Sequence, residues 1–297
     1  MLGGSMQVGC DRPSRPTVVI GGGVGPLAGV FLHEQILRHT KGVQRDSDHL
    51  DIWHVADVST MPDRTAFLLG SHSDNPSHVM ARNLVQVGEI LYRAGRYWVL
   101  AVPCGTFHAV PILTPLIEAC SRSPSFLGLY HLIEETLRCL HESPAKPYQV
   151  GVLSTLGAYS AGVWREPLTA AGFAVLEPEM TTRAAVHDAI YNPQLGLKSV
   201  TPPSETAYTA IVGAVAELAA SGADAVILGC TELQFVRDKL VDAYPELCIC
   251  DPVSVLAQSL SNLANGATPL SYHSEGFLYR HGQDKATRSL NRSEVTR

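Results

Sequence analysis

The sequence has 297 residues, of which 45% are hydrophobic and 17% charged, with a formal net charge of −6 and a pI near 6.0. This composition is typical of a packed globular protein and excludes a largely disordered chain, and the length suits two domains of ordinary size. The acidic balance and the lack of any block of basic residues argue against a nucleic-acid partner.

Eight short apolar runs alternate along the sequence with longer stretches of helical length. In chain order they are TVVIGGG, LDIWHVAD, YWVLAVPC, FLGLY, QVGVLST, FAVLEP, AVILGC and LCICDPV. Runs rich in Val, Ile and Leu on both faces are typical of strands buried in a parallel sheet, so the alternation predicts an α/β fold. Residues 1–16 and 266–297 show no such pattern, and we predict flexible tails there.

Location and redox state follow from what the sequence lacks. No apolar run is long enough to cross a bilayer, and the first 20 residues lack the apolar centre of a secretory signal, so we expect a cytoplasmic protein with no membrane partner. Seven irregularly spaced cysteines predict free thiols in that reducing compartment. The close pair Cys248 and Cys250 supplies only two of the four ligands that structural zinc needs, so we predict no metal site.

The second half of the sequence repeats the pattern of the first. Residues 18–25, VVIGGGVG, align with residues 150–157, VGVLSTLG, as a strand followed by a turn of small residues. Further on, RAGRYWVLAVPCGT aligns with ASGADAVILGCTE, so that Cys104 and Cys230 each follow a strand. Two copies of one α/β unit explain this pattern and would pack about a pseudo-twofold axis. Because open parallel sheets bind ligands at the carboxyl ends of their strands, we predict a cleft between the halves with one thiol on each side.

Two of the seven cysteines are therefore candidates for chemistry. A free cysteine is usually a small apolar filler of the core, and five are interpreted in that way: Cys10, Cys120, Cys139, Cys248 and Cys250. Near Cys104 and Cys230, Thr106 and Thr231 are predicted to cap the helices that follow, which would lower the thiol pKa values below about 8.5 and let the same N–H groups hold a carboxylate. Two thiols on opposite faces of one carbon could remove a proton from one side and return one from the other, which inverts a stereocentre. His108, four residues after Cys104, would reach back to this turn from a helix.

The segment GGGVGPLAG, residues 21–29, also resembles a dinucleotide-binding turn. Gly23, Gly25 and Ala28 satisfy the pattern G-x-G-x-x-A after a strand. Pro26 inside the turn and the lack of an acidic residue closing a strand about 20 positions later argue against nucleotide binding. We favour glycines that let a loop approach the substrate, with Pro26 at the first position of a helix.

Five segments in order carry a resemblance to a known family: GGVGPLAG (22–29), MPDRTAFLLG (61–70), PCGTFH (103–108), AIYNPQLGLK (189–198) and LGCTEL (228–233). They resemble the signatures of the aspartate/glutamate racemase family, the amino-acid racemases that work without pyridoxal phosphate, through most of residues 17–262. The resemblance implies two pseudo-symmetric, flavodoxin-like three-layer α/β domains with an active-site cleft between them, the first from 17–118 with about 250–265 and the second from 119–249. It also implies a small amino-acid substrate, no cofactor and a homodimer.

The resemblance also implies roles for single residues. Cys104 and Cys230 match the catalytic pair. Arg64 resembles the arginine that receives the substrate's side-chain carboxylate, for which its guanidinium fork is suited, and Lys198 resembles a lysine that closes over the substrate. The threonines would help to hold the α-carboxylate, and the glutamate would orient its turn or join a hydrogen-bond network. The residues so expected to contact the substrate, besides Arg64 and Lys198, are Gly23, Gly105, Thr106, Thr231 and Glu232.

One position departs from the family pattern. The first cysteine motif of the family usually reads Cys-Asn-Thr, whereas this chain has Gly105 in place of the asparagine. Loss of the amide is expected to open space and to remove a donor and an acceptor for the substrate. Phe107 and Trp164 also differ from the smaller or phenolic residues expected. The preferred amino acid therefore stays open.

The residues support a racemase or epimerase of an acidic or related amino acid, with three alternatives. A related cysteine-dependent enzyme would isomerise or decarboxylate a small diacid without exchange at the α-carbon of an amino acid. A catalytically silent relative would bind an amino acid without turnover. A dehydrogenase would bind nicotinamide.

Overall fold

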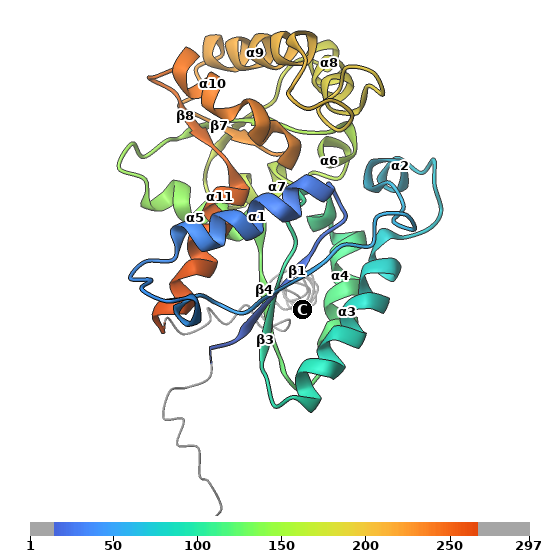
Figure 1. Ribbon diagram of the computed structural model, residues 1–297. Coiled ribbons are helices and arrows are strands. Elements are labelled where there is room, and N and C mark those ends of the chain that lie inside the picture. Colours follow the sequence, from blue (N-terminus) through green and yellow to red (C-terminus); the bar gives the residue numbers. More distant parts are fainter. Residues whose placement is uncertain (1–14, 267–297) are drawn as a thin grey trace, which may run out of the picture.

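The computed structural model describes residues 15–266, and nearly all of the tails predicted at 1–16 and 266–297 lie outside that range. Its strands form two parallel four-stranded sheets, one in each half of the molecule (Figure 1). The first has the order β2-β1-β3-β4 and contains β1 (Thr17–Gly21), β2 (Ile52–Val55), β3 (Trp98–Ala101) and β4 (Phe126–Tyr130). The second has the order β6-β5-β7-β8 and contains β5 (Gln149–Leu153), β6 (Ala174–Leu176), β7 (Ala225–Leu228) and β8 (Cys248–Cys250).

These two sheets confirm the predicted α/β fold and its internal repeat. Each strand lies within one of the eight apolar runs, and the order of the second sheet is that of the first with every number raised by four. The repeat aligned residues 18–25 with 150–157, and the strands at these places, β1 and β5, occupy the same position in their sheets. The cysteines follow β3 and β7, which are also equivalent.

The segments between the strands are mostly helical. The α-helices are α1 (Pro26–His39), α2 (Arg64–Leu68), α3 (Pro76–Arg93), α4 (Val110–Cys120), α5 (Leu132–Glu142), α6 (Leu156–Ser160), α7 (Arg165–Ala170), α8 (Met180–Tyr191), α9 (Glu205–Ala220), α10 (Arg237–Ala243) and α11 (Pro252–Ser261). Short 3₁₀-helices are η1 (Asp46–Asp48), η2 (Gly105–His108), η3 (Thr231–Val236) and η4 (Asn262–Asn265). Helix α1 begins at Pro26, as predicted, because a proline at this position loses no intrahelical hydrogen bond.

The first sheet is buried on both faces. Successive side chains of a strand point to opposite faces, so Val18 and Ile20 of β1 pack with α1 and α11, whereas Val19 packs with α3 and α4. The strands therefore read as continuous apolar runs. In the second half, Val226 and Leu228 of β7 pack with α8, α9 and α10.

One strand crosses the limit expected between the domains. Strand β4 lies beyond residue 118, where the sequence analysis ended the first domain, yet it pairs with β3 in the first sheet. Helix α11, which lies within the segment of about 250–265 assigned to the first domain, follows β8 of the second sheet and packs against α1 and α5 beside the first (Figure 1). The domain limits stay a prediction, and we propose that a boundary after α5 follows the sheets better than one at 118.

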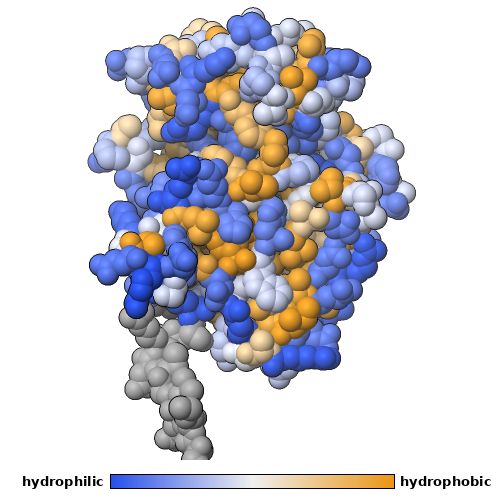
Figure 2. Space-filling model, viewed as in Figure 1, coloured by the Kyte–Doolittle hydropathy of each residue, from blue (hydrophilic) through white to orange (hydrophobic). Residues whose placement is uncertain are grey.

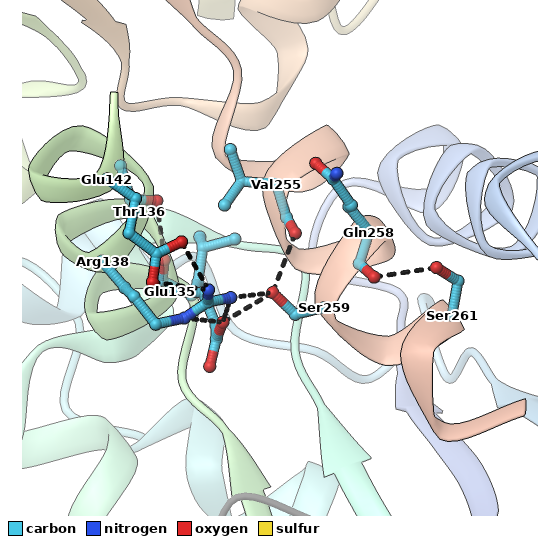
Figure 3. Close-up of polar contacts among 9 residues, drawn as sticks. Glu135, Thr136, Arg138, Glu142, Val255, Gln258, Ser259 and Ser261 are labelled. Carbon is cyan, nitrogen blue, oxygen red and sulfur yellow. Dashed lines mark hydrogen bonds and ion pairs between the residues drawn. The ribbon is translucent and has the colours of Figure 1, made fainter. Parts of the chain in front are cut away.

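A buried polar contact joins α5 to α11 (Figure 3). Glu135 is fully buried, and its Oε2 accepts hydrogen bonds from Nη2 of Arg138 at 2.6 Å and from Oγ of Ser259 at 2.5 Å. Ser259 in turn accepts a hydrogen bond from Arg138 at 2.8 Å. Since a buried carboxylate is costly without partners, this contact fixes how α11 meets the first half.

The outer surface mixes apolar and hydrophilic side chains. On the face in Figure 2, orange apolar patches are interrupted by blue hydrophilic residues. No helix within residues 15–266 is both long and apolar enough to cross a membrane.

Candidate functional site

The two cysteines occupy equivalent places at the carboxyl ends of β3 and β7. Cys104 is the residue just before η2 and Cys230 the residue just before η3, and each is only 6% exposed. The backbone is still extended at each cysteine and becomes helical at the next residue. Both thiols thus lie where parallel α/β sheets place their ligands.

The two cysteine turns touch each other through their glycines. A Cβ atom at position 105 would lie 2.3 Å from the carbonyl oxygen of Gly229 and 3.3 Å from Nε1 of Trp164. The residue after Cys104 therefore abuts the residue before Cys230. The expectation that Gly105 opens space was wrong, because the Gly229 backbone and the Trp164 indole fill the volume that a side chain at 105 would need.

Glu232 connects one thiol to a lysine. The Cys230 thiol donates a hydrogen bond to Oε2 of Glu232 at 3.0 Å, and Nζ of Lys198 lies 2.8 Å from Oε1 of the same carboxylate. The Glu232 side chain is only 7% exposed. Burial alone would raise the pKa of Glu232, but Lys198 and Cys230 together hold it below its ordinary value. Burial alone would lower the pKa of Lys198, but Glu232 above all raises it, so the pair is ionised at neutral pH.

Both thiols have raised pKa values. For Cys104, burial raises the pKa more than Arg64 lowers it. For Cys230, burial and then Glu232 raise the pKa well above its ordinary value, against the lowering effect of Lys198. The backbone N–H groups of Phe107 and Glu232 lower the two values, in the direction predicted from helix N-termini, but burial has the larger effect. The predicted lowering was therefore wrong for the protein without substrate.

The threonines do not cap helices. The cap positions of η2 and η3 belong to the cysteines themselves, and neither helix has a side-chain cap, because the chain becomes helical immediately after each cysteine. Both threonines are nevertheless buried within two residues of a cysteine in the sequence, Thr106 at 6% and Thr231 at 3% exposure. Oγ1 of Thr106 lies 3.2 Å from Oγ1 of Thr155, which begins α6 in the second half.

Arg64 is a buried cation at the start of α2. It is 8% exposed, and its Nη1 donates to the carbonyl oxygen of Pro62, at 3.3 Å. Within residues 15–266 it forms no ion pair with a carboxylate, and its buried Nε has no partner. Burial opposes its charge, yet Cys104 above all, then Tyr191, Asp63 and Glu232, raise its pKa. Such a guanidinium has hydrogen-bonding capacity left for an anion.

The residues on either side of Arg64 in the sequence are hydrogen-bonded to the second half. Oη of Tyr191 donates to Asp63 at 3.0 Å, and Oγ1 of Thr65 donates to Thr155 at 3.3 Å. Nζ of Lys198 lies 4.9 Å from the centre of the Tyr191 ring. Neither Tyr191 nor Thr155 was predicted from the sequence to belong to the site. Tyr191 lies inside the motif AIYNPQLGLK, and Thr155 lies in the turn of the repeat segment 150–157, so each stood in a segment that could have drawn attention to it.

The glycine loop before α1 reaches the site at Gly25 rather than at Gly23. Gly25 has a φ of 105°, and a Cβ atom there would lie 2.6 Å from Oε1 of Glu232. Gly23, with a φ of 80°, instead faces the backbone of Asp57, so it serves the turn itself. A glycine at position 25 thus lets the first half approach the carboxylate of the second.

His108 reaches back to the Cys104 turn, as predicted. Its Nε2 accepts a hydrogen bond from the N–H of Leu132 at 3.2 Å, so Nδ1 carries the proton and donates to the carbonyl oxygen of Cys104 at 2.9 Å. Burial lowers the pKa of His108 to about 4, against the raising effect of the bond to Cys104. The ring is therefore neutral at physiological pH and holds the turn in place.

The described residues offer no cluster of ligands for a metal ion. Between residues 15 and 266, no three His, Cys, Asp or Glu side chains are arranged to hold one. Cys248 and Cys250 lie on β8, and Cys250 is packed into the core.

Two like α/β halves whose cysteine turns meet at the carboxyl ends of equivalent strands define a class of protein, the duplicated α/β proteins. Comparison with protein-family models matches residues 22–260 to the family described as Asp/Glu/Hydantoin racemase. The chain belongs to this family. Its members are racemases, so the chain is an isomerase of that class.

Solved structures share this fold. An aspartate racemase from Picrophilus torridus gives a TM-score of 0.64 at 20% identity, covering 85% of this chain and 95% of that chain. An aspartate racemase homologue from Pyrococcus horikoshii gives a TM-score of 0.60 at 16% identity, covering 85% of this chain and 100% of that chain. A glutamate racemase from Francisella tularensis, solved with D-glutamate, gives a TM-score of 0.58 at 14% identity, covering 87% of this chain and 84% of that chain. At these identities the likeness establishes the fold alone. Comparison with curated protein sequences gives no match.

Proposed function

We propose that this isomerase is a cofactor-independent racemase or epimerase of an acidic or related amino acid, with Cys104 and Cys230 as its two bases. The observation that carries the proposal is the contact between the two cysteine turns, through Gly105 and Gly229. Cys104 directly precedes Gly105 and Cys230 directly follows Gly229, so this contact supports a single site for both thiols. Arg64 and Lys198 both act electrostatically on Cys104, and these cations suit an anionic substrate. Arg64 supports the acidic substrate, because a buried guanidinium without a carboxylate partner in the described chain is stabilised when an anion binds.

The proposed reaction needs one thiolate and one thiol at a time. One sulfur takes the α-proton while the other gives its proton to the opposite face, so the Cα–H bond on one side is replaced by a Cα–H bond on the other. Glu232 accepts the hydrogen bond of the Cys230 thiol, so it can orient this proton and receive it. Lys198 and Arg64 lower the pKa of Cys104, so both cations stabilise its thiolate.

Substrate groups can be assigned to the remaining residues. Thr106 and Thr231 lie within two residues of a cysteine in the sequence and are suited to hold the α-carboxylate, together with backbone N–H groups of η2 and η3. Arg64 would take the side-chain carboxylate. A homodimer and a cytoplasmic location stay predictions from the sequence.

A second candidate is a related reaction on a small diacid. Gly105 favours it, because no amide from this turn is available for a substrate amino group. Isomerisation or decarboxylation of a diacid would release product without deuterium exchange at an amino acid's α-carbon, so the same assay distinguishes the two candidates.

The test is incubation in deuterated water, without added cofactor, with each enantiomer of aspartate, glutamate and a panel of other amino acids. Optical rotation follows inversion and mass spectrometry follows α-deuteration. Cys104→Ser and Cys230→Ser should each reduce racemisation by at least about 10²-fold, because each removes a proton-transfer group. Cys139→Ser, a half-buried thiol on α5, is the matched control and should retain activity. Full activity in both site variants would refute the two-thiol mechanism.

A further inference from the structure

The carbonyl oxygen of Gly229, just before Cys230, is held by two donors. Nε1 of Trp164 donates to it at 3.2 Å and Oγ of Ser154 at 3.3 Å. The N–H of Gly229 donates to Leu153 at 2.7 Å. Trp164 is 2% exposed, so its hydrogen bond is shielded from water. The peptide that precedes the second thiol is thus fixed on both sides.

This same carbonyl is the point at which the first cysteine turn arrives. A Cβ atom at Gly105 would lie 2.3 Å from it, and a Cβ atom at Gly229 would lie 2.6 Å from Nε1 of Trp164. Neither glycine has a positive φ, so the backbone conformation at these positions does not call for glycine. Glycine is needed at both positions because of the close approach, since no real Cβ atom fits at those distances.

Trp164 is itself anchored in the core. It lies between α6 and α7, its carbonyl accepts from the N–H of Leu168, and its ring belongs to the apolar cluster that also contains Cys104 and Phe107. Trp164 therefore contacts both cysteine turns. It lies against the first turn at Gly105, and its N–H donates to the Gly229 carbonyl of the second turn. Gly105, Gly229 and Trp164 therefore form one contact, which we name the glycine–tryptophan contact.

We propose that Trp164 is a positioning residue that sets the spacing of the two cysteine turns through the glycine–tryptophan contact. The proposal rests on the proposed two-thiol racemisation. A proton must leave one face of the α-carbon and arrive on the other while both sulfurs are within reach. If the turns move apart, the first sulfur still takes the α-proton and exchanges it with solvent, but it more often returns a deuteron to the same face. Exchange then continues with retention, while inversion slows.

The experiment measures the ratio of α-deuterium exchange to inversion in deuterated water for three variants. Trp164→Phe removes the N–H and keeps a ring, and should lower inversion about fivefold, the rate equivalent of one lost hydrogen bond, while exchange falls less. Gly105→Ala keeps Trp164 but adds the Cβ that meets the Gly229 carbonyl. It should also raise the ratio of exchange to inversion, as Trp164→Phe does. The double variant should show less than the product of the two effects, because both act on one contact.

Controls separate this role from general stability. Trp98→Phe makes the same chemical change at a fully buried tryptophan of β3 whose Nε1 has no partner in the described chain, and should leave the ratio unchanged. Thermal unfolding of every variant checks folding. A wild-type protein that neither exchanges nor inverts any amino acid would refute the proposed function. Wild-type racemisation with an unchanged ratio in both Trp164→Phe and Gly105→Ala would overturn the role of Trp164 alone.

Discussion

Glu232 contacts the Cys230 thiol with one oxygen and Lys198 with the other, and both charged groups influence the pKa of Cys230. The carboxylate raises the pKa of Cys230, second only to burial, while Lys198 lowers it. A negative charge beside a thiol disfavours the thiolate, whereas an ammonium favours it. Burial and Glu232 therefore both favour the protonated thiol of Cys230, and Lys198 opposes them.

Glu232→Gln should shift the ionisation of Cys230 to lower pH, because the substitution removes a charge that raises the thiol pKa and leaves Lys198 without its carboxylate. Thiolate absorbance against pH measures the shift, with Cys230→Ser in each background as the blank. Racemisation should fall at the same time, since the thiol loses its proton acceptor. Glu205→Gln, at an exposed position of α9, should change neither quantity. An upward shift or no shift in the Glu232 variant would contradict this account of the pair.

The 3₁₀-helix η2 and helix α5 are joined by one imidazole. His108 lies in η2, donates to the Cys104 carbonyl and accepts from the first residue of α5, Leu132. A short helix with few internal hydrogen bonds depends on such contacts for its position. The neutral ring is needed for both bonds, because a protonated ring has no acceptor.

This arrangement predicts a pH dependence of stability. The folded pKa of His108 is about 4, below its ordinary value near 6.5. Between these values the unfolded chain binds a proton that the folded chain does not. The contribution of His108 to the free energy of unfolding is therefore complete above about pH 6.5. It declines as the pH falls towards 4, by up to about 3 kcal/mol. His108→Gln should be less stable than the wild type at pH 7.5, and the difference in the free energy of unfolding should narrow by pH 4.5. Urea unfolding at several pH values measures it, and a constant difference would contradict the assignment.

The whole molecule repeats one unit, and that repeat was visible in the sequence. The apolar runs predicted every strand in residues 15–266, because strands buried on both faces leave a continuous apolar signal. The cysteines were predicted to lie at equivalent strand ends because the repeat aligns them. Cys230, Glu232 and Lys198 were each identified from motifs, and the structure brings them into direct contact.

The rest depends on contacts between segments far apart in the sequence. Nothing local to Gly105 announces that Gly229, 124 positions later, fills its side-chain volume, nor that Trp164 holds the same carbonyl. The raised thiol pKa values arise from burial, a property of the packed molecule, so a local argument from helix ends gave the wrong sign. The capping role of the threonines failed because the cysteines take the cap positions.

The most direct measurement of the two-thiol claim follows α-proton exchange separately for each enantiomer in Cys104→Ser and Cys230→Ser. Each variant keeps one thiol on one face of the substrate. Each should therefore lose inversion and retain exchange with one enantiomer only, and the two variants should favour opposite enantiomers. Loss of exchange for the same enantiomer in both variants, or inversion that survives either substitution, would contradict the claim that the thiols serve opposite faces.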